Sequence, residues 1–228
     1  MSTYIITIAG DGARWALMHG VRKHMVAIAG EPNLLRTIRL IKEFDPSAQI
    51  IVGCNMDFFP KELDELDIVT YDGRSYLKGT EADRYFASMP FWSPNGRTTL
   101  IWGDVFFTKA ALKTVCAPKD TWHRYGRPGA GLYKSYGEEF AIDFYPEHCE
   151  LVRRSSALVE DISLRTSIQL FGAVYLAMLG KQSNTIINDS TSGRKPNYGH
   201  MIEIDDLTDD FDFPSDYERF LQLYRGDD

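Results

Sequence analysis

Short apolar segments alternate with amphipathic stretches in the first half of this 228-residue chain, and this pattern constrains the fold most strongly. Residues 4–9, 49–54 and 98–102 are runs of the kind found in strands that are buried on both faces. Between the first two, residues 32–44 carry apolar side chains on one stripe, and Pro32 suits the first turn of a helix. The alternation predicts an α/β fold: a three-layer sandwich with a mostly parallel central sheet and a central first strand.

The pattern changes beyond residue 115. Residues 121–127 and 138–144 have the composition of strands and are separated by a glycine-rich loop, so we expect a small mixed β extension of the sheet in a single domain. The other elements that we expect are a strand at 67–71, helices at 80–89, 107–115 and 164–179, a polar mobile loop at 184–199, a strand at 201–204 and a helix at 214–224.

Charge and cysteine content narrow the classes of function. The net charge is -7, with 32 acidic residues against 25 lysines and arginines, which argues against broad nucleic-acid binding but leaves room for a local basic cleft. The three cysteines lack Cys-x-x-Cys spacing, so neither a zinc knuckle nor a disulfide framework is indicated. No apolar run approaches the ~20 residues of a membrane span, and the first residues do not resemble a signal peptide. We expect a cytoplasmic protein with no membrane partner.

A glycine-rich loop follows the first strand, after Ala9. Gly10 and Gly12 allow a tight turn and offer backbone N–H groups to an anion. Arg14 adds a guanidinium that suits phosphate oxygens. The loop has neither the Lys-Ser/Thr of a Walker sequence nor the third glycine of a dinucleotide fingerprint. A phosphate site and a plain turn after the strand are both open readings.

Two aspartates are candidate metal ligands. Asp104 follows Gly103 at the end of the strand at 98–102, and ligands of open α/β sheets bind at the carboxyl ends of strands. Asp212 precedes Pro214, where it could equally cap the helix that follows. A plain turn residue is the alternative for Asp104. If both aspartates bind one magnesium ion, which prefers carboxylate oxygens, they should meet at the carboxyl edge of the sheet.

The loop between the two strands of the mixed extension is a candidate acceptor site. Arg127, Lys134 and Glu138 flank its glycines, and basic side chains beside glycines suit a second anion such as a sugar phosphate. An ordinary surface loop is the alternative. None of the five histidines has metal-ligand spacing, and none is assigned to catalysis.

Taken in order, these motifs resemble the signature of the sugar-phosphate nucleotidyltransferase and cytidylyltransferase superfamily, which has a GT-A-like nucleotide-binding fold. Arg22 stands where that family usually has proline, and Ala13 where it commonly has threonine or serine. The resemblance covers residues 1–115 and about 203–224 and is poor over 120–200. The residues that carry it are Gly10, Gly12, Arg14, Lys23, Gly30, Pro32, Gly79, Thr80, Gly103, Asp104 and Asp212.

The resemblance implies a magnesium-dependent enzyme, with manganese as a possible substitute, that moves a nucleotidyl group from a nucleoside triphosphate to a phosphorylated sugar or similar small acceptor and releases pyrophosphate. Residues 1–115 would bind the nucleotide and residues 116–228 the acceptor. The implied roles are catalysis for Arg14 and Lys23, nucleotide binding for Ala9, Gly10, Gly12, Arg14, Lys23, Gly79 and Thr80, acceptor binding for Arg127, Lys134 and Glu138, and metal binding for Asp104 and Asp212.

Two alternatives stay open. One is a GT-A-type glycosyltransferase that uses a nucleotide-sugar, although Val105 and Phe106 follow Asp104 where such enzymes usually have Asp-x-Asp. The other is a nucleotide-binding module without catalysis.

Overall fold

The computed structural model describes residues 1–10, 15, 20–56, 60–66, 68–76, 78–132, 134–194 and 196–226. Within these residues a seven-stranded sheet runs through both halves of the chain. Its strand β1 (Thr3–Ile8) pairs in parallel with β4 (Gln49–Cys54) on one side and with β6 (Thr98–Trp102) on the other. β5 (Val69–Asp72) continues the sheet in parallel beyond β4. The prediction of a mostly parallel sheet with a central first strand is confirmed.

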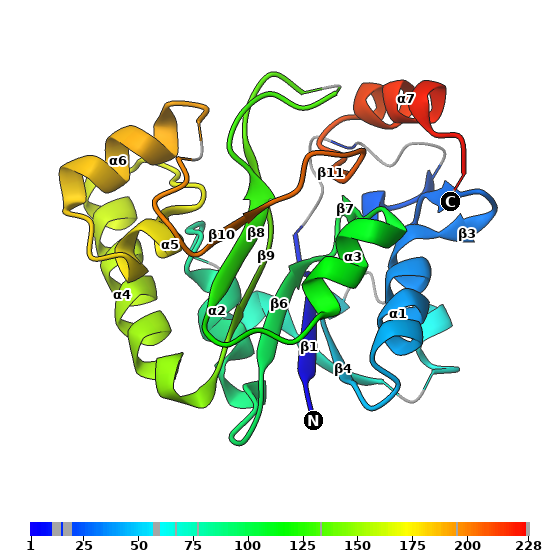
Figure 1. Cartoon of the computed structure of the whole chain (residues 1–228), viewed down its shortest axis with the longest axis horizontal. Helices are drawn as coiled ribbons and strands as arrows, with labels where there is room; N and C mark the ends of the chain where they lie inside the picture. The colour runs from blue at the N-terminus through cyan, green and yellow to red at the C-terminus, as the bar shows by residue number, and fades with distance from the viewer. Residues whose placement is uncertain are drawn as a thin grey trace.

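The mixed extension is also confirmed. β9 (Glu138–Phe144) is antiparallel to β6 and to β8 (His123–Arg127), and β10 (Met201–Glu203) pairs in parallel with β8 at the edge of the sheet. Since β8 runs parallel to β1, the loop from β8 to β9 lies at the edge where β1, β4 and β6 end. It rises above that edge in Figure 1.

Helices cover both faces of the sheet (Figure 1). α1 (Asn33–Phe44) and α3 (Lys109–Cys116) contact each other on one side. α2 (Asp83–Ser88), α4 (Cys149–Thr166), α5 (Ala173–Met178) and α6 (Ser183–Thr191) form the layer on the other side. No helix in the described ranges is both long and apolar enough to cross a membrane.

Two short pairings and a final helix complete the fold. β2 (Ala27–Ile28) and β3 (Glu31–Pro32) form a hairpin before α1. β7 (Val105–Phe106) pairs with β11 (Asp209–Asp210), and α7 (Pro214–Leu223) follows. The pairing of β7 with β11 returns the last part of the chain to the end of β6.

The structure corrects two predicted elements in the second half. The helix expected at 164–179 is instead the end of α4 and the whole of α5. Ser167 (φ 57°) and Gly172 (φ 69°) have left-handed backbone conformations, which a right-handed helix does not tolerate; Ser167 ends α4, and Gly172 precedes α5. The polar loop expected at 184–199 is helical up to Thr191, because Ile186 is fully buried and anchors α6 to the protein.

A buried cluster of polar groups closes the edge of the sheet opposite to the ends of β1, β4 and β6. Arg97 is 4% exposed and donates hydrogen bonds to three backbone carbonyls at the end of α3 and, at 2.7 Å, to the hydroxyl of Tyr4. It also lies 3.3 Å from a carboxylate oxygen of Asp143. That carboxylate accepts further hydrogen bonds from the Tyr125 hydroxyl (2.9 Å) and the His123 backbone N–H (2.8 Å). The cluster therefore joins β1, β6, β8, β9 and α3.

Replacing Arg97 by leucine should lower the free energy of unfolding by about 3–5 kcal/mol, because it leaves the buried Asp143 carboxylate without its cation. Urea denaturation would measure the loss. Arg165→Leu is the matched control, since its ion pair with Asp161 is exposed and should contribute at most about 1 kcal/mol. Equal losses in the two variants would contradict the role given to Arg97.

Candidate functional site

A cavity of about 750 Å³ opens where the parallel strands end. Residues 7–10 from the end of β1, Gly53 from β4 and Trp102 from β6 lie along its base. Tyr136, Ser190, Thr191 and Gly193 line it from the second half of the chain. Both halves therefore contribute to one cavity at the carboxyl edge of the sheet, where ligands of open α/β sheets bind.

An ion pair between Lys23 and Asp104 lies in this cavity. Burial raises the pKa of Asp104, but the Lys23 ammonium outweighs burial and lowers that pKa to about 2. Burial lowers the pKa of Lys23, but Asp104 outweighs it, so the pKa of Lys23 is raised. Both groups are therefore charged at neutral pH.

Gly103 explains why Asp104 can reach this position. Its N–H donates to the carbonyl of Thr7 at 3.1 Å, so the chain stays against β1 as it leaves the sheet. A Cβ on residue 103 would lie 2.2 Å from Cγ2 of Ile8, which only glycine avoids.

Three carboxylates gather at a second place in the cavity wall. Ligand oxygens of Glu138, Asp210 and Asp212 all lie within 4.8 Å of one another. The Lys134 ammonium, whose side chain is 2% exposed, pairs with Asp210 and lies 3.4 Å from Glu138 and 3.5 Å from Asp212. Tyr136 donates its hydroxyl to Asp212 at 3.2 Å. Glu138, Asp210 and Asp212 are called the carboxylate cluster below.

Neighbouring charges shift the pKa values of Asp210 and Lys134 in this part of the cavity. Burial and the neighbouring Glu138 raise the pKa of Asp210 well above its usual value. Burial lowers the pKa of Lys134, but the surrounding carboxylates, Asp210 first, outweigh it and raise that pKa. Oxygen donors at this spacing fit magnesium or manganese by their chemistry. Lys134 is the positive charge that balances them in this structure.

The predicted metal ligands lie in one cavity but have different neighbours. Asp104 and Asp212 both line the cavity. Asp104 is paired with Lys23, whereas Asp212 lies with Glu138 and Asp210. That Asp104 and Asp212 share one ion stays a prediction.

The predicted nucleotide residues are placed as follows. Ala9, Gly10, Lys23 and Thr80 line the cavity. Gly12 and Arg14 lie outside the described residues, so their expected contact with phosphate stays a prediction. Gly79 has a positive φ of 80° and belongs to the turn that leads to Thr80.

The predicted acceptor residues differ from one another in position. Glu138 lines the cavity, but Arg127 and Lys134 do not. Arg127 is buried, and its guanidinium bonds Asp209 at 2.7 Å and the carbonyls of Thr208 and Gly129. It holds β11 beside the end of β8, and its expected contact with an acceptor stays a prediction.

Asp83 fixes the turn at residues 78–80. One carboxylate oxygen accepts the N–H groups of Lys78, Gly79 and Thr80 at 2.9–3.0 Å, and the other accepts the Thr80 hydroxyl. The helix expected to begin at Thr80 therefore begins at Asp83. An acidic residue three positions after threonine usually marks that threonine as the helix cap, but here the pair closes the turn and Ala82 is the residue before the helix.

Glu81 joins the same turn to the second half of the chain. Its buried carboxylate accepts the N–H groups of Gly172, Ala173 and Val174 at the start of α5. These residues are far from Glu81 in the sequence, and no local pattern indicated the contact.

His24 is another cavity residue that the sequence left unassigned. Burial lowers its pKa to about 4, so the ring is neutral at neutral pH. Its Nε2 has no hydrogen-bond partner in the part of the chain that the structure describes.

No protein-family model matches the sequence, and no curated protein matches it. Several solved structures have a fold similar to that of this chain. The inositol-1-phosphate CTP transferase from T. maritima covers 98% of this chain and 96% of its own, with a TM-score of 0.56 at 16% identity. The CTP:phosphocholine cytidylyltransferase LicC from Streptococcus pneumoniae covers 97% of this chain and 98% of its own, with a TM-score of 0.57 at 14% identity.

A third similar structure is a putative glucose-1-phosphate thymidylyltransferase from Bacillus anthracis, which covers 99% of this chain and 96% of its own, with a TM-score of 0.56 at 14% identity. At these identities the similarity concerns the fold. The chain has the fold of the sugar-phosphate nucleotidyltransferases and cytidylyltransferases, as its motifs predicted.

Proposed function

We propose that this chain is a nucleotidyltransferase that moves a nucleotidyl group from a nucleoside triphosphate to the phosphate group of a small acceptor. The observation that carries the proposal is one cavity with two charged sites, the Lys23–Asp104 ion pair and the carboxylate cluster, at the edge where β1 and β6 end. Phosphoryl chemistry asks a protein mainly to position groups and to balance charge, and these two sites suit both tasks.

In the proposed reaction an oxygen of the acceptor phosphate attacks the α-phosphorus of the nucleotide. The bond from the α-phosphorus to its bridging oxygen breaks, and pyrophosphate leaves with the electron pair. Lys23 would stabilise the negative charge that grows on pyrophosphate, together with Arg14. The turn that Asp83 holds at Gly79 and Thr80 would position the nucleobase.

The oxygen ligands of the cavity fit a divalent cation. Asp104 and Asp212 would hold it, with Asp210 and Glu138 close to Asp212. A bound magnesium ion would supply positive charge to the phosphates.

Release of pyrophosphate tests the proposal. The purified chain would be incubated with magnesium, each of the nucleoside triphosphates in turn, and inositol 1-phosphate, phosphocholine or glucose 1-phosphate. Pyrophosphate that appears only with both substrates and disappears with EDTA supports nucleotidyl transfer. Release of a nucleoside diphosphate from a nucleotide-sugar would favour glycosyl transfer, and binding without turnover would favour a non-catalytic module.

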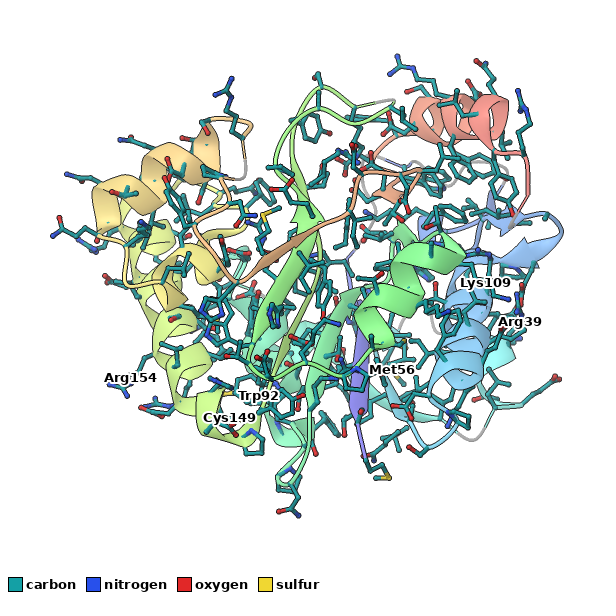
Figure 2. All side chains as sticks on the ribbon, in the orientation of Figure 1. Arg39, Met56, Trp92, Lys109, Cys149 and Arg154 are labelled. Atoms are coloured by element: carbon teal, nitrogen blue, oxygen red, sulfur yellow. The ribbon has the colours of Figure 1, made fainter. Side chains whose placement is uncertain are left out.

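Lys23→Ala should lower kcat by about 10²-fold or more, because an electrostatic contact to the developing charge is lost. Asp104→Asn and Asp212→Asn should abolish activity that depends on magnesium while the thermal unfolding midpoint stays near that of the parent. Lys109→Ala is the matched control, since Lys109 lies on the outer side of the molecule near Arg39 (Figure 2) and pairs with Glu43. Undiminished turnover in Lys23→Ala would remove Lys23 from the mechanism.

Lys134→Met should destabilise the protein by about 3 kcal/mol when EDTA is present, because the carboxylate cluster then has no cation. Magnesium should restore more stability to this variant than to the parent, since a cation bound only by the folded state stabilises it. The thermal unfolding midpoint with EDTA and with magnesium is the measurement. Lys181→Met, which removes a cation stacked over Tyr198, is the control. The same magnesium response in parent and Lys134→Met would contradict this role of Lys134.

A further inference from the structure

Arg84 presents a guanidinium to the cavity from the first turn of α2. Its Cζ lies 4.2 Å from the centre of the Trp102 ring. Trp102 is 5% exposed and is held in turn by an edge contact with the buried Tyr85. A guanidinium stacked on a fixed ring has its plane set, while its N–H groups remain available around the edge.

Among the described residues, none accepts a hydrogen bond from Arg84 and no carboxylate forms an ion pair with it; its guanidinium lies over the Trp102 ring, and its charge also helps to lower the pKa of Asp104. This is unusual because three carboxylates line the same cavity close by in the fold, those of Glu81, Asp83 and Glu139.

Each of those carboxylates is already bound elsewhere. Asp83 accepts hydrogen bonds from residues 78–80, and Glu81 accepts the N–H groups at the start of α5. Glu139 lies 2.7 Å from the guanidinium of Arg124. The fold thus keeps Arg84 available as a cation in the cavity, which is the arrangement expected of a site for an anionic ligand.

We propose that Arg84 binds the phosphate group of the acceptor through paired N–H donors. The inference rests on the proposed function and names the binding residue for its second substrate. A planar guanidinium matches two oxygens of one phosphate, and the ring contact holds it in the orientation for binding.

The position of Arg84 in the fold favours the acceptor over the triphosphate as its ligand. In the proposed function, the triphosphate already has a cation in Lys23, which pairs with Asp104 beside the end of β1. Trp102 belongs to β6, which lies between β1 and β9. α2, which carries Arg84, contacts α4 of the second half. Arg84 therefore belongs to an element that packs against the half of the chain proposed to bind the acceptor.

Calorimetric titration with two probes that contain no nucleobase separates the two sources of phosphate. Inorganic phosphate represents the acceptor, and inorganic triphosphate represents the nucleotide. Arg84→Gln should weaken the binding of phosphate by at least about tenfold and change the affinity for triphosphate by less than about threefold. Lys23→Ala should show the opposite pattern. Arg84→Lys should recover only part of the phosphate affinity, since an ammonium lacks the paired donors.

Arg154→Gln is the matched control, because Arg154 is 73% exposed, pairs with Glu150 and lies on the outer side of α4 (Figure 2). It should bind both probes as the parent does. Thermal unfolding midpoints of the Arg84 variants near that of the parent would show that the variants are folded.

Three outcomes would overturn the inference: no phosphate binding by the parent, unchanged phosphate binding in Arg84→Gln, or equal losses for both probes, which would assign Arg84 to the triphosphate. The pyrophosphate assay distinguishes a failure of this inference from a failure of the proposed function. If the parent releases pyrophosphate and Arg84→Gln still binds phosphate normally, this inference alone fails. If the parent never releases pyrophosphate but loses phosphate binding in Arg84→Gln, the anion site stands and the proposed function fails.

Discussion

The parallel pairing of β1 with both β4 and β6 is the constraint on which the rest of the structure depends. It directs the ends of three strands to one edge, and residues from these strand ends line one cavity. The contact is closest between Gly103 and the end of β1, where no side chain beyond hydrogen fits. Asp104 is the next residue, and its place beside Lys23 follows from how tightly β6 packs against β1.

The second half of the chain completes this edge because its strand β9 runs in the opposite direction to β6. β9 runs antiparallel to β6, and its first residue, Glu138, therefore begins at the edge where β6 ends. The pairing of β11 with β7 then brings Asp210 and Asp212 to the same place. The cavity collects several carboxylates, and most of them are balanced by a cation or by backbone N–H groups.

Much of the fold could be predicted because its strands are continuous apolar runs and α1 and α7 have clear amphipathic stripes. α4 was missed because serines such as Ser155, Ser156 and Ser163 interrupt its buried face and weaken the apolar pattern. The site was predicted where a motif carries its own geometry, as at Gly103 and Asp104. The pairing of Arg127 with Asp209 could not be predicted, because the two residues are 82 positions apart and a sequence pattern does not show which basic residues are neutralised in this way.

The carboxylate cluster is completed only late in the synthesis of the chain. Strands β1, β4, β6 and β9 and the residues Lys23, Asp104 and Lys134 all precede β11 in the chain. During synthesis on the ribosome, the sheet can therefore assemble while Lys134 still lacks two of its three cluster partners. Only the arrival of residues 209–212 completes the charge balance, so an unfinished chain, or one cut by a protease before β11, would lack two of the three carboxylates of the cluster.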